Sequence, residues 1–168
     1  MKYSVGDGAY ADRRSTCEGA STILGVPSLR DISPSGLDDV LSRLPAGSVP
    51  RVRHVVSEIA RVGAAADALR AGQWQRLGEL MSSSHVSLRD DYEVSSVELD
   101  EAVASALGAG ALGARMTGAG FGGSAIALVP AESADDLAAA VTDAFASRGF
   151  GPPAIFAAEP GPGATRLS

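Results

Sequence analysis

Four glycines crowd into six positions of the segment RMTGAGFGGSAIALV, residues 115–129, and this cluster restricts the fold more than any other feature of the chain. Gly118, Gly120, Gly122 and Gly123 can adopt positive φ and let backbone N–H groups approach a neighbour closely. The preceding ALGARMT alternates in polarity and the following SAIALVP is largely apolar, so both flanks are typical of β-strands, the second mostly buried. The chain is therefore expected to contain a strand–loop–strand unit.

Three interpretations compete for a glycine loop of this kind. A dinucleotide-binding loop requires a helix directly after the glycines, whereas SAIALVP is strand-like and ends at Pro130. A protein-kinase loop does lie between strands, but it requires a lysine on the next strand, and the chain has no lysine after Lys2. The third interpretation is a hairpin that binds nothing. Four glycines where one or two would suffice favour close packing against another structure.

The rest of the chain predicts a single α+β domain, residues 1–168, with an antiparallel sheet covered by helices. Apolar residues at three- and four-residue spacing predict helices over residues 10–24, 37–41, 52–69, 74–88, 95–107 and 133–145. The third and fourth of these form an antiparallel helical hairpin, and the fifth opens on a capping box of Ser95 and Glu98. After the hairpin the predicted order is β-β-α-β, with PAIFAA as the last strand, and MKYSV is typical of the tail of a strand.

Composition excludes several classes of partner. The net charge is −6 and the basic residues form no stripe, which argues against nucleic acid and anionic membrane surfaces. No apolar run has the length of a membrane span. The single cysteine, Cys17, excludes an internal disulfide and fits a helix core in a reducing cytoplasm. We expect a cytoplasmic globular domain without a membrane or nucleic-acid partner.

The glycine segment resembles the third signature motif of galactokinases and other GHMP small-molecule kinases. AYADRRSTCEGAS, SLRDIS, RHVVSEIARV and LGELMSSSHVSLRDDYEVSSVELD precede it in the galactokinase order with similar spacing, so the resemblance covers residues 1 to about 130. Mevalonate and homoserine kinases share mainly the glycine motif with galactokinases. The resemblance implies the fold of a GHMP-kinase C-terminal domain and, in the intact enzyme, transfer of phosphate from ATP with Mg²⁺ to the anomeric hydroxyl of galactose.

Site roles follow from the same resemblance. It implies that Gly118, Gly120, Gly122 and Gly123 support the main phosphate-binding loop beside the ATP site, and that Tyr10 contacts the sugar. No catalytic residue and no metal ligand is expected in this chain. In the family, the catalytic arginine, the phosphate loop and the aspartate base belong to an N-terminal domain, which is absent from these residues.

We therefore expect the chain to reach galactose and ATP only through that N-terminal domain, and to be inactive alone. The alternatives are a non-catalytic sugar-sensing or regulatory remnant of the same fold, and another GHMP sugar kinase.

Two histidines and an aspartate pair suggest other chemistry. His85 follows three serines and precedes Asp90 and Asp91, as in a Ser-His-Asp hydrolase. These residues lie on one predicted helix and its exit, without the exposed nucleophile turn that such a site needs. We expect His54 to be a partnered histidine at the edge of an apolar stripe, and the aspartates to serve in capping or solvation.

Overall fold

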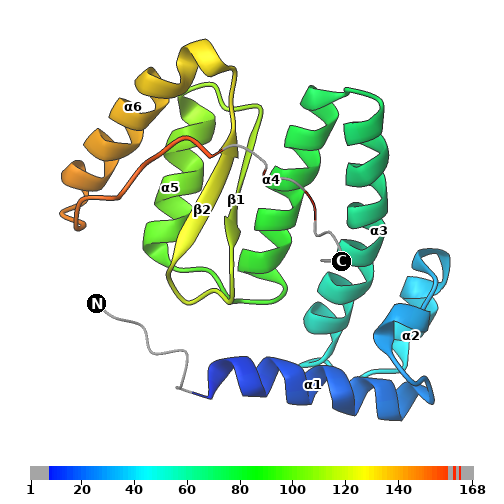
Figure 1. The fold of residues 1–168 in the computed structure, drawn as a ribbon. Coiled ribbons are helices and arrows are strands. Elements are labelled where there is room, and N and C mark those ends of the chain that lie inside the picture. The colour runs from blue at the N-terminus through cyan, green and yellow to red at the C-terminus, as the bar shows by residue number, and fades with distance from the viewer. Residues whose placement is uncertain (1–7, 159–160, 162, 164–168) are drawn as a thin grey trace, which may run out of the picture.

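The computed structural model describes residues 8–158 together with residues 161 and 163 (Figure 1). Its helices are α1 (Ala9–Leu24), α2 (Leu37–Ser42), α3 (Val49–Arg70), α4 (Trp74–Asp90), α5 (Val97–Gly108) and α6 (Ala134–Ser147), and its strands are β1 (Gly113–Thr117) and β2 (Ser124–Leu128). The predicted helices, the helical hairpin and the strand–loop–strand unit are all present. The predicted α+β class with an antiparallel sheet is confirmed. The predicted strand MKYSV lies outside the described residues.

The first three helices share one apolar cluster. Helix α1 ends at Gly25, whose φ of 70° is the left-handed conformation that glycine favours at a helix end. Cys17 packs against this cluster, partly buried, as expected of a core cysteine. Its buried members are Ala20, Leu24, Leu29, Ile32, Leu41, Leu44, Val52 and Val56.

Helix α4 touches strand β1 backbone to backbone. A Cβ added at Gly78 would lie 2.0 Å from the carbonyl oxygen of Leu112, so only glycine permits this approach. Two side chains of α4 then accept hydrogen bonds from the outer edge of the strand. The N–H of Ala114 donates to Ser82 Oγ at 3.4 Å, and the N–H of Met116 donates to His85 Nδ1 at 3.2 Å. The helix thereby covers a strand edge that would otherwise need another strand.

The outer edge of β2 is open among the described residues. Strand β2 pairs only with β1, antiparallel, with Arg115 opposite Ile126. The expectation of a mostly buried second strand is wrong, because no residue of β2 is buried and Ile126 is 49% exposed. The expected last strand is also not formed, since residues 151–158 are irregular and Ile155 and Phe156 are exposed.

Helices α5 and α6 cover β1 and β2 with a second apolar cluster, which includes Val103, Ala114, Leu137 and Phe145. Helix α5 is capped one residue later than predicted, because the N–H of Leu99 donates to Ser96 Oγ at 3.3 Å.

Ser95 Oγ instead donates to Asp100 Oδ1 at 2.6 Å, which explains why it does not cap the helix.

In the part of the chain that the structure covers, every helix is too short or too polar to cross a membrane.

Candidate functional site

The loop between β1 and β2 has an unusual backbone. Its four glycines have φ of 87°, 87°, 120° and 104°, in chain order from Gly118 to Gly123, and Phe121 between them has φ of 59°. Residues other than glycine rarely adopt such backbone angles. The prediction that the glycines serve positive φ is confirmed, whereas their role at a phosphate site stays a prediction.

The glycines of this loop differ in what surrounds them. A Cβ added at Gly120 would lie 2.3 Å from the carbonyl oxygen of Val94, and that oxygen accepts the N–H of Phe121 at 2.7 Å. Val94 of this chain therefore provides part of the close packing that the glycines predict. Gly118 and Gly123 have no atom within 4 Å of an added Cβ. These two positions are open to a group from outside the domain.

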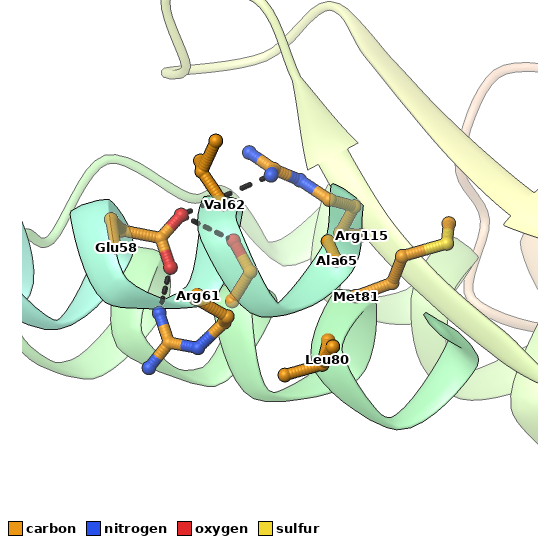
Figure 2. A pocket seen from close by; sticks show the side chains of 8 residues that line it. Glu58, Arg61, Val62, Ala65, Leu80, Met81 and Arg115 are labelled. Carbon is orange, nitrogen blue, oxygen red and sulfur yellow. Dashed lines mark hydrogen bonds and ion pairs between the residues drawn. The ribbon is translucent and has the colours of Figure 1, made fainter. Parts of the chain in front are cut away.

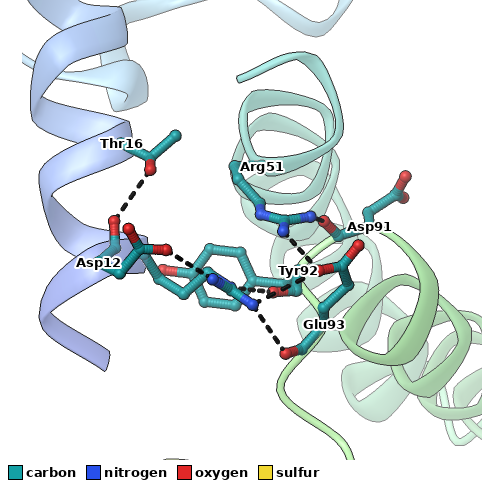
Figure 3. Close-up of polar contacts among 7 residues, drawn as sticks. Asp12, Thr16, Arg51, Asp91, Tyr92 and Glu93 are labelled. Carbon is teal, nitrogen blue, oxygen red and sulfur yellow. Dashed lines mark hydrogen bonds and ion pairs between the residues drawn. The ribbon is translucent and has the colours of Figure 1, made fainter. Parts of the chain in front are cut away.

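The segment that follows α4, residues 91–94, also contacts helix α1. Arg13, on α1, donates through Nε to the carbonyl oxygen of Tyr92 at 2.7 Å and through Nη2 to that of Glu93 at 3.2 Å (Figure 3). Arg51, on α3, donates to the carbonyl oxygen of Asp91 at 2.5 Å and to Glu93 Oε2 at 2.6 Å. The hydrogen bond from Arg51 lowers the pKa of Glu93. Residues 91–94 therefore hold both α1 and the glycine loop.

Tyr10 lies in the first turn of α1, one turn before Arg13, and its side chain is 52% exposed. It is not a core residue, although its seven-residue spacing to Cys17 also allowed that interpretation. Helix α1, which carries Tyr10, is joined to the glycine loop through Arg13 and residues 91–94. The hairpin loop and the start of α1 lie at the same end of the fold (Figure 1).

Sequence reasoning missed the two arginines that join these elements. Arg13 contacts Tyr92 across 79 positions of chain, and Arg51 contacts Glu93 across 42. No local spacing links such residues. Only the excess of arginine over lysine pointed to bidentate contacts of this kind.

His54 supports the same segment from the core, as expected of a partnered histidine. Its ring is buried, stacks on Tyr92 with centroids 4.5 Å apart, and has Nδ1 2.9 Å from Ser87 Oγ. Because the Ser87 hydroxyl donates to Asp91 Oδ2, its oxygen accepts a hydrogen bond from the Nδ1–H of His54. Burial, with a smaller contribution from Arg61, lowers the pKa of His54 to about 4.

His85 is equally occupied with structural contacts. It is buried, its Nδ1 accepts the N–H of Met116, and its Nε2 lies 3.2 Å from Asp100 Oδ1. Burial lowers the pKa of the ring. His85 thus fixes the end of β1 where the glycine loop begins, and within residues 8–158 no serine is hydrogen-bonded to its ring.

The acidic pair after α4 is tied to protein partners. Asp91 accepts the hydroxyl of Ser87 and pairs with Arg53, and Asp90 pairs with Arg89. Within residues 8–158, 161 and 163, no group of three or more His, Cys, Asp or Glu side chains is placed to hold a metal ion.

Acidification should destabilise the fold through His54. Between about pH 7 and pH 4.5 the unfolded histidine takes up a proton, while the folded one, with its pKa near 4, stays mostly neutral. Stability is therefore lost as the pH falls, by about 2–3 kcal/mol for this residue. Urea unfolding at both pH values measures it. His54→Gln keeps a polar partner for Ser87 and should remove this part of the pH-dependent loss, whereas the part that comes from His85, whose pKa burial also lowers, should remain; an unchanged loss would contradict the assignment.

This chain is similar in sequence and in fold to known proteins. Residues 65–147 match the model of the GHMP kinases C terminal family. Galactokinase of Streptomyces coelicolor is 47% identical over 99% of this chain, which spans 44% of that protein. Galactokinase of Chloroflexus aurantiacus is 46% identical over 88% of the chain, which spans 40% of its length. The crystal structure of Lactococcus lactis galactokinase complexed with galactose superposes with a TM-score of 0.86 at 35% identity, covering 90% of this chain and 41% of that one.

Proposed function

The chain belongs to the GHMP kinases through its C-terminal domain, the part it shares with galactokinases, and on that premise we propose that it works as the C-terminal part of a cytoplasmic galactokinase. The proposed reaction moves the terminal phosphate of ATP, as its Mg²⁺ complex, to the anomeric hydroxyl of galactose. One observation carries the proposal. Residues 91–94 hold both the helix with Tyr10 and the loop with the open glycines.

Such an anchor suits phosphoryl transfer, because catalysis of this reaction consists mainly of positioning and charge stabilisation. In the proposal, the exposed Tyr10 hydroxyl binds a sugar hydroxyl. Gly118, Gly122 and Gly123 give the loop its shape, and the open space at Gly118 and Gly123 admits a phosphate-binding loop from the N-terminal domain. Gly120 supports the site indirectly by docking the loop on Val94.

The catalytic arginine, the base and the main phosphate loop are assigned to an N-terminal domain. The chain spans less than half the length of the galactokinases it matches, so the relatives contain room for such a domain. The open edge of β2 and the exposed side chains of Ile126 and Phe156 support a domain that packs against further polypeptide. An exposed strand edge with apolar neighbours is otherwise an aggregation hazard.

The sugar assignment is tested by Tyr10→Phe in a chimera that joins this domain to the N-terminal part of the S. coelicolor enzyme. Losing one hydrogen bond to a neutral hydroxyl costs about 0.5–1.5 kcal/mol, so the KM for galactose should rise roughly 2- to 12-fold. The KM for ATP should not change. Steady-state kinetics with each substrate varied in turn gives both values.

Trp74→Phe is the matched control, because Trp74 is an aromatic side chain with similar exposure at the start of another helix. It should leave both constants unchanged. Equal changes for galactose and ATP with Tyr10→Phe would argue against a sugar contact. Galactose binding without phosphorylation in a folded chimera would favour the sensor alternative.

A further inference from the structure

A small pocket lies between α3 and α4, beside β1 (Figure 2). Its volume is about 60 Å³. Apolar side chains such as Val62 and Met81 form part of its wall. Its polar groups are Glu58, Arg61, Ser84 and Arg115.

The carboxylate of Glu58 is already engaged. One of its oxygens pairs with Arg61, and the other accepts the hydroxyl of Ser84 at 2.6 Å. Arg115 Nη1 lies 3.9 Å from that second oxygen, at the outer limit of an ion pair. Arg115 Nε donates to the carbonyl oxygen of Met116 at 2.9 Å. Within the described part of the chain, this is the one hydrogen bond of the Arg115 side chain, and its outer guanidinium edge is left for another acceptor.

The pocket therefore holds two cations against one carboxylate, in a chain whose net charge is −6. The side chains of Arg61 and Arg115 are only 18% and 31% exposed. Burial lowers the pKa of both groups, and Arg115 lowers that of Arg61 further. Burial is the main cause of the lowered pKa values of His54 and His85, and Arg115 adds a smaller lowering to both. One carboxylate does not balance two half-buried cations, and an unbalanced buried charge is unfavourable, so this arrangement favours an anion in the pocket.

We propose that the pocket between α3, α4 and β1 binds an oxyanion, a phosphate or carboxylate group, through the outer edge of the Arg115 guanidinium. A guanidinium presents two parallel N–H groups that match two oxygens of either ligand. The volume exceeds what a single water needs, so a group of a few heavy atoms fits. The ligand is either a free anion or a carboxylate of another polypeptide. The proposal rests on the pocket alone and is independent of the kinase assignment.

Thermal unfolding of the 168-residue chain tests this, with about 50 mM phosphate compared with chloride at equal ionic strength. For binding near 10 mM we expect phosphate to raise the Tm by roughly 2–4 °C more in the wild type than in Arg115→Met. The comparison between variants is needed because phosphate also stabilises proteins by exclusion from their surface. Arg76→Met is the control, because Arg76 is an exposed arginine paired with Glu79 on α4, and it should keep the full shift.

A second variant and a second readout protect the test against misfolding of Arg115→Met. Arg115→Lys keeps the charge but loses the two-pronged geometry, so it should also lose most of the specific shift. In NMR spectra, the Nε–Hε signal of Arg115, assigned by its absence from the Arg115→Lys spectrum, should move with phosphate and saturate.

Acetate distinguishes the two sources of the ligand. A response to both anions supports a site for free oxyanions, and a response to acetate alone supports a carboxylate from another chain segment. If neither anion affects the wild type more than the Arg115 variants, and the Arg115 signal does not move, the proposal is wrong.

Discussion

Replacing Gly120 with valine is expected to destabilise the domain by about 3–5 kcal/mol, the sum of backbone strain and overpacking. The strain arises because φ at this position is 87°. The overpacking arises because a Cβ would lie 2.3 Å from the carbonyl oxygen of Val94 and 2.8 Å from its Cβ. Urea unfolding of the 168-residue chain measures the change. The hydrogen bond from Phe121 to Val94 would be lost with it, so the loop should also detach from residues 91–94.

Gly118→Val is the matched control, because Gly118 has the same φ of 87° but no atom within 4 Å of an added Cβ. It carries the strain alone and should cost only about 1–3 kcal/mol. In the chimeric kinase, the quantity to compare is kcat instead of stability. If the open space at Gly118 admits the phosphate loop, Gly118→Val should greatly reduce kcat while the domain stays folded. Equal stabilities of the two valine variants would show that the contact with Val94 does not restrict Gly120.

The helices of this domain were predictable because their apolar spacing is local. Helix α1 ends at Leu24, directly before Gly25, and α2 begins at Leu37, as the spacing predicts, and Leu137 and Phe145 face the core from α6. The capping serine was misplaced by one residue, since Ser95 and Ser96 are chemically alike and only the contact with Asp100 separates them.

Strand burial and the shape of the site were not predictable in the same way. An apolar strand such as β2 looks buried in sequence, but its burial depends on what packs against the two faces of the sheet and along its free edge. Gly118 and Gly120 are both glycines with the same φ. Only the tertiary packing shows that Gly118 is open and that Gly120 is confined. The joining of α1 to residues 91–94 depends on contacts across 79 positions, which no local pattern encodes.

The largest expected effect is on catalysis itself. The 168-residue chain alone should not phosphorylate galactose, because the proposal assigns the phosphate loop, the base and the catalytic arginine to an N-terminal domain. Joined to the N-terminal part of the S. coelicolor enzyme, the same domain should support turnover on the order of 1–100 s⁻¹, the usual range for kinases. The identity of 47% between the two chains makes a compatible domain interface a reasonable expectation.

The assay that decides between these outcomes is galactose-dependent ATP consumption, measured for the chain alone, the chimera and a protein-free blank. The account predicts that the chain alone matches the blank and that the chimera consumes ATP only when galactose is present. A rate of about 1 s⁻¹ or more from the chain alone would contradict the assignment of the catalytic groups to another domain. A folded chimera without galactose-dependent turnover would contradict the central claim that this chain is the C-terminal part of a galactokinase.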